Sequence, residues 1–129
     1  MAKIVVVSSS CLQLQILEKR LKENDHSVVC FTSAVELEYK IVAESPDLVL
    51  MDISFSGGNG FQTCRELRKN FRFEKLPIIL CGEGEREDLK VWAKGQGASE
   101  YLVKPLEASK LLTVIKSHLS PQNLARAQP

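Results

Sequence analysis

The sequence has little net charge and no long hydrophobic run. Lysine and arginine total 17 against 16 aspartate and glutamate residues, which leaves a formal net charge of +1. This balance gives no indication of nucleic acid or an anionic membrane as a partner. The longest apolar run near the N-terminus spans only residues 4–7, which is too short for a signal peptide core or a membrane span. We therefore expect a cytoplasmic protein that binds neither nucleic acid nor membrane.

Cysteine is sparse and scattered. The four cysteines form no CxxC pair and have no histidine beside them; they are Cys11, Cys30, Cys64 and Cys81. Zinc sites and disulfide frameworks need clustered ligands or paired cysteines. We expect reduced thiols that behave as small, buried or half-buried hydrophobic side chains.

The 129 residues are 44% hydrophobic and 26% charged, which is typical of one globular domain and excludes a disordered chain, a collagen-like fibre and a disulfide-rich miniprotein. We expect a single domain over residues 1–120. Residues 121–129 have no stripe of apolar positions to face a core, so we expect a mobile tail there.

Two kinds of segment alternate along the chain. Short apolar runs rich in β-branched residues are typical of strands covered on both faces of a parallel sheet; they span residues 4–7, 28–31, 48–51, 78–81 and 101–103. Between them lie segments with helical spacing, including one around Leu14, Leu17 and Leu21 and others over residues 60–70, 86–96 and 107–119. The alternation predicts an α/β fold, a doubly wound, five-stranded parallel sheet sandwiched by five helices.

Helix starts are indicated by two capping boxes. Ser10 with Gln13, and Ser33 with Glu36, have the spacing in which a hydroxyl accepts a backbone N–H and the second side chain reaches back. The spacing predicts that Ser10 and Ser33 begin the first two helices.

Ligands of doubly wound sheets bind beyond the carboxyl ends of the strands. The residues at these positions are therefore the candidates for a site. They are Ser8, Ser9 and Ser10 after the first run, Asp52 after the third, Gly82 and Glu83 after the fourth, and Lys104 after the fifth.

Two of these segments resemble the receiver domain of bacterial two-component response regulators, of the single-domain, CheY-like kind. The first is PDLVLMD (46–52) followed by GGNGF (57–61), and the second is GASEYLVKPL (97–106). The resemblance covers residues 3 to about 119. Within the family, KVWAKGQGA (90–98) together with GFQ (60–62) is most similar to regulators of type IV pilus (twitching) motility.

The resemblance implies a phosphorylation site with four parts. Asp52 matches the phosphoacceptor, Lys104 matches the lysine that neutralises the phosphoryl group, and Tyr101 matches an aromatic switch that turns inward on activation. The family's acidic Mg²⁺-binding pair is replaced by Ser8 and Ser9, and its switch hydroxyl is replaced by Gly82. Mg²⁺ is usually held by carboxylates, so we expect weak or absent Mg²⁺ binding and no cofactor.

These departures favour an atypical (pseudo-)receiver, a signalling protein-interaction module rather than an enzyme, with weak or no Mg²⁺-dependent phosphorylation of Asp52. One alternative is a working phosphoacceptor in a two-component or chemosensory phosphorelay. Another is a flavodoxin-like ligand-binding protein in which Ser8, Ser9 and Ser10 cradle a phosphate. A DNA-binding regulator is disfavoured by the balanced charge.

We expect the interaction face at Lys90, Trp92, Lys94 and Tyr101, with a sensor or chemosensory kinase, pilus machinery or a scaffold as the partner. Trp92 fits either this face or the core, and Tyr101 also fits an ordinary strand tyrosine with its hydroxyl at the surface. Glu83 and Glu85 are either a solvated loop or replacements for the missing acidic pair. A monomer or weak dimer is expected.

Overall fold

A computed structural model describes residues 2–83 and 87–119. Its main sheet has five strands, all parallel, in the order β2-β1-β3-β6-β7. The strands are β1 (Lys3–Val7), β2 (Ser27–Phe31), β3 (Leu48–Asp52), β6 (Ile78–Glu83) and β7 (Glu100–Lys104). The predicted doubly wound sheet is therefore confirmed. The order reverses between β1 and β3, and in such sheets the crevice at this reversal is where ligands bind.

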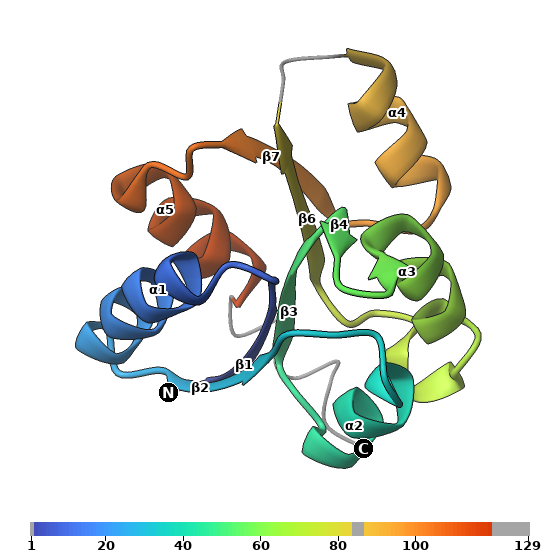
Figure 1. The fold of residues 1–129 in the computed structure, drawn as a ribbon, viewed down its shortest axis with the longest axis horizontal. Coiled ribbons are helices and arrows are strands. Elements are labelled where there is room, and N and C mark those ends of the chain that lie inside the picture. The colour runs from blue at the N-terminus through green and yellow to red at the C-terminus, as the bar shows by residue number, and fades with distance from the viewer. Residues whose placement is uncertain (1, 84–86, 120–129) are drawn as a thin grey trace.

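Helices cover both faces of the sheet (Figure 1). On one face lie α1 (Cys11–Glu23) and α5 (Ala108–His118). On the other lie α2 (Leu37–Glu44), α3 (Gly60–Arg68) and α4 (Glu87–Gly95). The predicted helices at 60–70 and 107–119 are each slightly shorter in the structure. Residue 86, the predicted start of α4, and the predicted mobile tail at 121–129 lie outside the described residues.

The sheet separates two apolar clusters, which explains the continuous hydrophobic runs. In β1, Val5 and Val7 pack into the cluster that includes α2 and α3, whereas Ile4 and Val6 pack into the one that includes α1 and α5. Successive side chains of a strand point to opposite faces, so both sets are buried. The edge strand β2 is the exception, because its apolar residues are only half-buried.

The first predicted helix cap is half right and the second is wrong. The Ser10 hydroxyl accepts a hydrogen bond from the backbone N–H of Gln13 at 3.2 Å, as predicted. Ser33 does not begin α2; it forms an isolated bridge with Ser56, and the helix starts only after Glu36, which has a φ of 52° and no side-chain cap. The bridge keeps the chain extended beyond β2, and this delays the helix.

A small hairpin after β3 was not predicted. It consists of β4 (Ser54–Phe55) and β5 (Gly58–Asn59), with Gly57 at the turn at a φ of +78°. At the start of α3, a Cβ on Gly60 would collide with the backbone oxygen of Asp52. Glycine at this position therefore lets the chain fold back tightly over the end of β3. A single 3₁₀ turn, η1 (Phe71–Phe73), follows α3.

All four thiols are free, as expected, but they differ in burial. Cys64 and Cys81 are buried and Cys30 is intermediate, whereas Cys11 is exposed at the start of α1, contrary to the expectation. Within residues 2–83 and 87–119, no helix has the length and apolarity needed to cross a membrane.

Candidate functional site

Asp52 and Lys104 meet at the carboxyl edge of the sheet. Asp52 ends β3 and Lys104 ends β7, and β6 lies between them, with Asp52 paired to Cys81 and Lys104 paired to Glu83. The Lys104 Nζ lies 2.9 Å from the Asp52 Oδ1, and the two side chains are only 20% and 7% exposed. The sequence prediction that these two residues form one site is consistent with this geometry.

Gln13 is a member of the site that the sequence analysis missed. Its Nε2 donates a hydrogen bond to the Asp52 Oδ1 at 3.2 Å, so the same oxygen accepts from both Gln13 and Lys104. The capping-box spacing had assigned this side chain to the backbone N–H of Ser10. That N–H instead donates to the Ser8 hydroxyl at 3.1 Å, which leaves the Gln13 amide free to turn toward Asp52.

Ser8 and Ser9, at the positions of the missing acidic pair, hold backbone in place. Ser8 is fully buried, and its oxygen accepts from Ser10. The Ser9 hydroxyl oxygen accepts from the backbone N–H of Ser56 at 2.6 Å, which ties the β1–α1 connection to the loop after β3. Each serine oxygen therefore already has a structural partner, and the Ser10 hydroxyl has one too. The backbone N–H groups of Ser10 and Gln13, which a phosphate at this helix start would use, already donate to serine oxygens, and this weighs against a phosphate cradle at residues 8–10.

The donor set fits Mg²⁺ poorly. A hard cation of this kind needs carboxylate oxygens and near-octahedral geometry. Asp52 is the one carboxylate in the set that it forms with Ser8, Ser9, Gln13 and Lys104. Its Oδ1 accepts from Lys104 and Gln13, and both serine oxygens accept from backbone amides. Across the described ranges, no three His, Cys, Asp or Glu side chains cluster as a metal site would require. Glu83 is exposed at the end of β6, and Glu85 lies outside the described residues.

The space beside Gly82 is filled by Tyr101. A Cβ on Gly82 would meet the Tyr101 hydroxyl, and it would also lie 2.6 Å from the Ile53 Cδ1. Tyr101 is only 7% exposed and its hydroxyl oxygen is buried, so the alternative of a hydroxyl at the surface is wrong, whereas its place on the interaction face stays a prediction. Burial raises the pKa of the Tyr101 hydroxyl, and it likewise raises that of the neighbouring Cys81 thiol.

The remaining predicted residues lie on α4, which packs against β7. Trp92 is 57% exposed and packs edge-on against Phe61 of α3, with ring centroids 6.4 Å apart. Lys90 pairs with Glu87 at 3.5 Å, and Lys94 is exposed. Trp92 is therefore a surface residue rather than a core residue.

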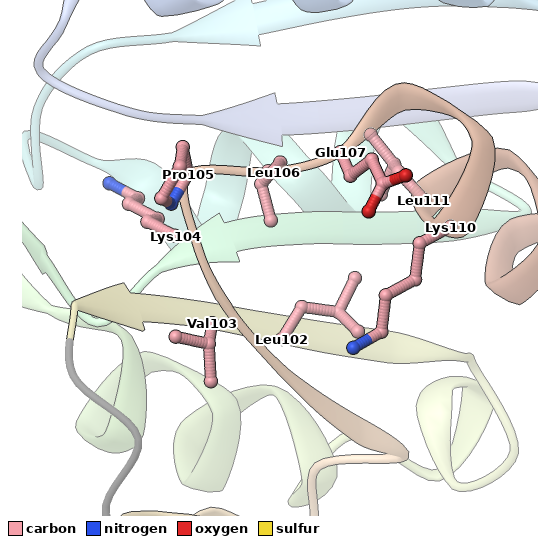
Figure 2. Close-up of a pocket in the computed structure, with 8 residues that line it drawn as sticks. All are labelled: Leu102, Val103, Lys104, Pro105, Leu106, Glu107, Lys110 and Leu111. Atoms are coloured by element: carbon pink, nitrogen blue, oxygen red, sulfur yellow. The ribbon is translucent and has the colours of Figure 1, made fainter.

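A shallow pocket of about 200 Å³ lies beside the Lys104–Pro105 turn. Figure 2 shows the side chains of Lys104 and Pro105 at one end and those of Glu107 and Lys110 at the other. Lys104 lines this pocket and its ammonium pairs with Asp52, so the pocket borders the carboxylate site.

Comparison with known proteins gives consistent matches. Residues 4–116 match the family described as the response regulator receiver domain. The chain is 36% identical to Protein PilH of Pseudomonas aeruginosa over 120 residues, which covers 93% of this chain and 99% of PilH. It is similar to the BeF3-activated N-terminal receiver domain of RstA from Klebsiella pneumoniae, with 30% identity, a TM-score of 0.84, and 92% and 98% of the two chains covered. A two-component response regulator from Clostridium difficile is 25% identical, with a TM-score of 0.86 over 95% of this chain and 99% of the other.

Proposed function

Since this chain belongs to the response regulator receiver domain family, we propose that it is an atypical receiver that signals by binding other proteins. Its output depends little on phosphorylation of Asp52, and it is not an enzyme. The finding that carries this proposal is the set of contacts around Asp52. One carboxylate oxygen accepts from both Lys104 and Gln13, and serines stand where the family has its acidic pair.

These contacts weaken the physical basis of ordinary phosphoryl transfer. Transfer to a carboxylate depends on positioning and on neutralising the charge that builds on the phosphoryl group. Lys104 supplies one positive charge, but Ser8 and Ser9 supply none of the negative charge that holds a divalent cation. Gly82 has no hydroxyl to contact a phosphoryl group. We infer weak or absent Mg²⁺ binding and slow transfer.

A working phosphoacceptor is the second candidate, and the Asp52–Lys104 pair is the observation that favours it. The nucleophile and the lysine are both present and are already in contact. In this case Asp52 would accept a phosphoryl group from a partner kinase, and the Gln13 amide would take over part of the positioning.

The partner is a protein of a signalling pathway, and motility is the pathway that we favour. The support is the resemblance of residues 90–98 to regulators of type IV pilus motility, together with the match to PilH. A kinase, a pilus component or a scaffold in the cytoplasm fits this proposal. The exposed residues Trp92 and Lys94, with Lys90, form the surface of α4 that we expect it to contact.

An Mg²⁺ titration followed by amide NMR tests the proposal. We expect no saturable shift at the amides of Ser9, Asp52 and Ile53 at millimolar Mg²⁺, in the wild type or in a matched Asp52→Asn variant. A saturable shift in the wild type that is lost in Asp52→Asn would contradict the proposal and favour the working phosphoacceptor.

A further inference from the structure

Tyr101 has an unusual combination of burial and missing hydrogen bonds. Its side chain is 7% exposed, and within the described part of the chain its hydroxyl oxygen is buried without a hydrogen-bond partner. Burying a hydroxyl in this way is unfavourable. The ring therefore stays inside because its apolar surface is packed there and not because a polar group holds it.

Glycine at position 82 is what makes this packing possible. A Cβ at Gly82 would collide with the Tyr101 hydroxyl and would lie 2.6 Å and 3.0 Å from two carbons of Ile53. Real Cβ contacts essentially never fall below 3.0 Å, so any larger side chain must displace both the tyrosine hydroxyl and the isoleucine side chain. The phenol thus occupies the volume that a side chain at position 82 would take.

No side chain at position 82 connects Tyr101 to Asp52. The hydrogen-bonding and ionic partners of the Asp52 carboxylate are Gln13 and Lys104. Gly82 follows Cys81, the strand partner of Asp52, but it has no side chain that could move toward the carboxylate and thereby open or close space for the ring.

We propose that the Gly82–Tyr101 packing locks the aromatic ring inward whatever the charge on Asp52, so that the neighbouring surface of α4 and β7 presents one fixed conformation to its partner. This inference rests on the proposed function, because it specifies how that binding surface is regulated. The partner then recognises a preformed surface, and control comes from the availability of the partner or of this protein.

Fluorine NMR of protein containing 3-fluorotyrosine tests the lock directly. The chain has two tyrosines, Tyr39 and Tyr101. Tyr39 is an internal reference because it is 76% exposed, whereas Tyr101 is only 7% exposed. A soluble paramagnetic probe should broaden the Tyr39 resonance strongly and the Tyr101 resonance little. In Asp52→Asn, which removes the charge, we expect the same contrast. Strong broadening of Tyr101 in either protein would overturn the proposal.

Substitution at the glycine is the second arm of the test. Gly82→Thr should expose the ring, so that broadening of the Tyr101 resonance rises toward that of Tyr39. Gly95→Ala is the matched control, because nothing lies within 4 Å of a Cβ built there, and it should leave both resonances unchanged. If Gly82→Thr does not fold, the replacement experiment uses Gly82→Ala. This substitution is made in the wild type and in Tyr101→Phe, and we expect it to lower the melting temperature less in Tyr101→Phe. Equal losses, or a Tyr101 ring still shielded in folded Gly82→Thr, would overturn the proposal.

These results are distinguishable from failure of the proposed function. An Mg²⁺ site at Asp52 would contradict the proposed function and leave the position of the Tyr101 ring unaffected. Conversely, an exposed Tyr101 ring in a protein without Mg²⁺ binding would overturn only the lock.

Discussion

The Lys104 ammonium lies 2.9 Å from the Asp52 Oδ1, and both side chains are largely shielded from water. This ion pair joins the ends of β3 and β7 across β6. Partly buried charges need compensation, and removing one partner leaves the other uncompensated. Removing either partner alone should therefore cost stability.

Lys104→Met should lower the free energy of unfolding by about 3 kcal/mol, because the buried Asp52 carboxylate loses its cation. Urea denaturation measures this loss. The double variant Lys104→Met/Asp52→Asn is the control, and it should recover part of the stability because no unpaired charge remains. A loss as large in the double variant would show that the ion pair is not the cause.

Gln13→Glu should place a second carboxylate beside Asp52. We expect a loss of roughly 1–2 kcal/mol, less than the value of about 4 kcal/mol for fixed charges 4 Å apart, because the new side chain can turn to water. Millimolar Mg²⁺ should then raise the melting temperature of this variant but not of the wild type. Gln15→Glu, at an exposed position of the same helix, is the matched control. Equal responses of the two variants to Mg²⁺ would contradict a specific role for Gln13.

Arg68 links the end of α3 to two later segments. Its guanidinium donates to the backbone oxygens of Phe73 and Leu76 at 2.6 Å each, and to that of Gly97 at 2.8 Å. Burial lowers the pKa of this group, but its ordinary value is so high that it stays charged at neutral pH. Arg68→Met should cost about 3 kcal/mol, because three carbonyls lose their donor. In thermal or urea unfolding, Lys69→Met at the exposed neighbouring position should change stability by less than about 0.5 kcal/mol; a similar small effect for Arg68→Met would refute the role.

The four thiols should react with Ellman's reagent in a definite order at pH 8. Cys11 is exposed and should react first. Cys30 should be slower, because burial and the nearby Glu18 raise its pKa. Burial raises the pKa of Cys64 and Cys81, so at this pH they hold less reactive thiolate, and they should react only on unfolding. Cys11→Ser should remove the fast phase; rapid reaction of a third thiol in the native protein would contradict the described packing.

The sheet and the Asp52–Lys104 pair could be predicted because each rests on a local signal. Continuous apolar runs mark buried parallel strands, and polar residues directly after them fall at one edge of the sheet. Gln13 could not be found in this way. Its side chain has two acceptable acceptors, the N-cap backbone and Asp52, and only the tertiary structure decides between them.

The cap predicted at Ser33 is wrong and the sequence leaves the position of the Tyr101 ring open, and both have the same kind of cause. The sequence around Ser33 has the spacing of a helix cap, but Ser33 instead forms a bridge with Ser56, 23 residues later. The position of the Tyr101 ring depends on the volume left by Gly82 on another strand. A single sequence carries no signal for such long-range competition.

We infer that the Asp52 site does not undergo efficient Mg²⁺-dependent phosphorylation. The most direct test is incubation with a small-molecule phosphodonor, with and without Mg²⁺, followed by intact mass measurement beside a folded Asp52→Ala control. We predict no Mg²⁺-dependent phosphoryl adduct in the wild type. An adduct that requires Mg²⁺ and disappears in Asp52→Ala would contradict the claim and identify the protein as a working phosphoacceptor.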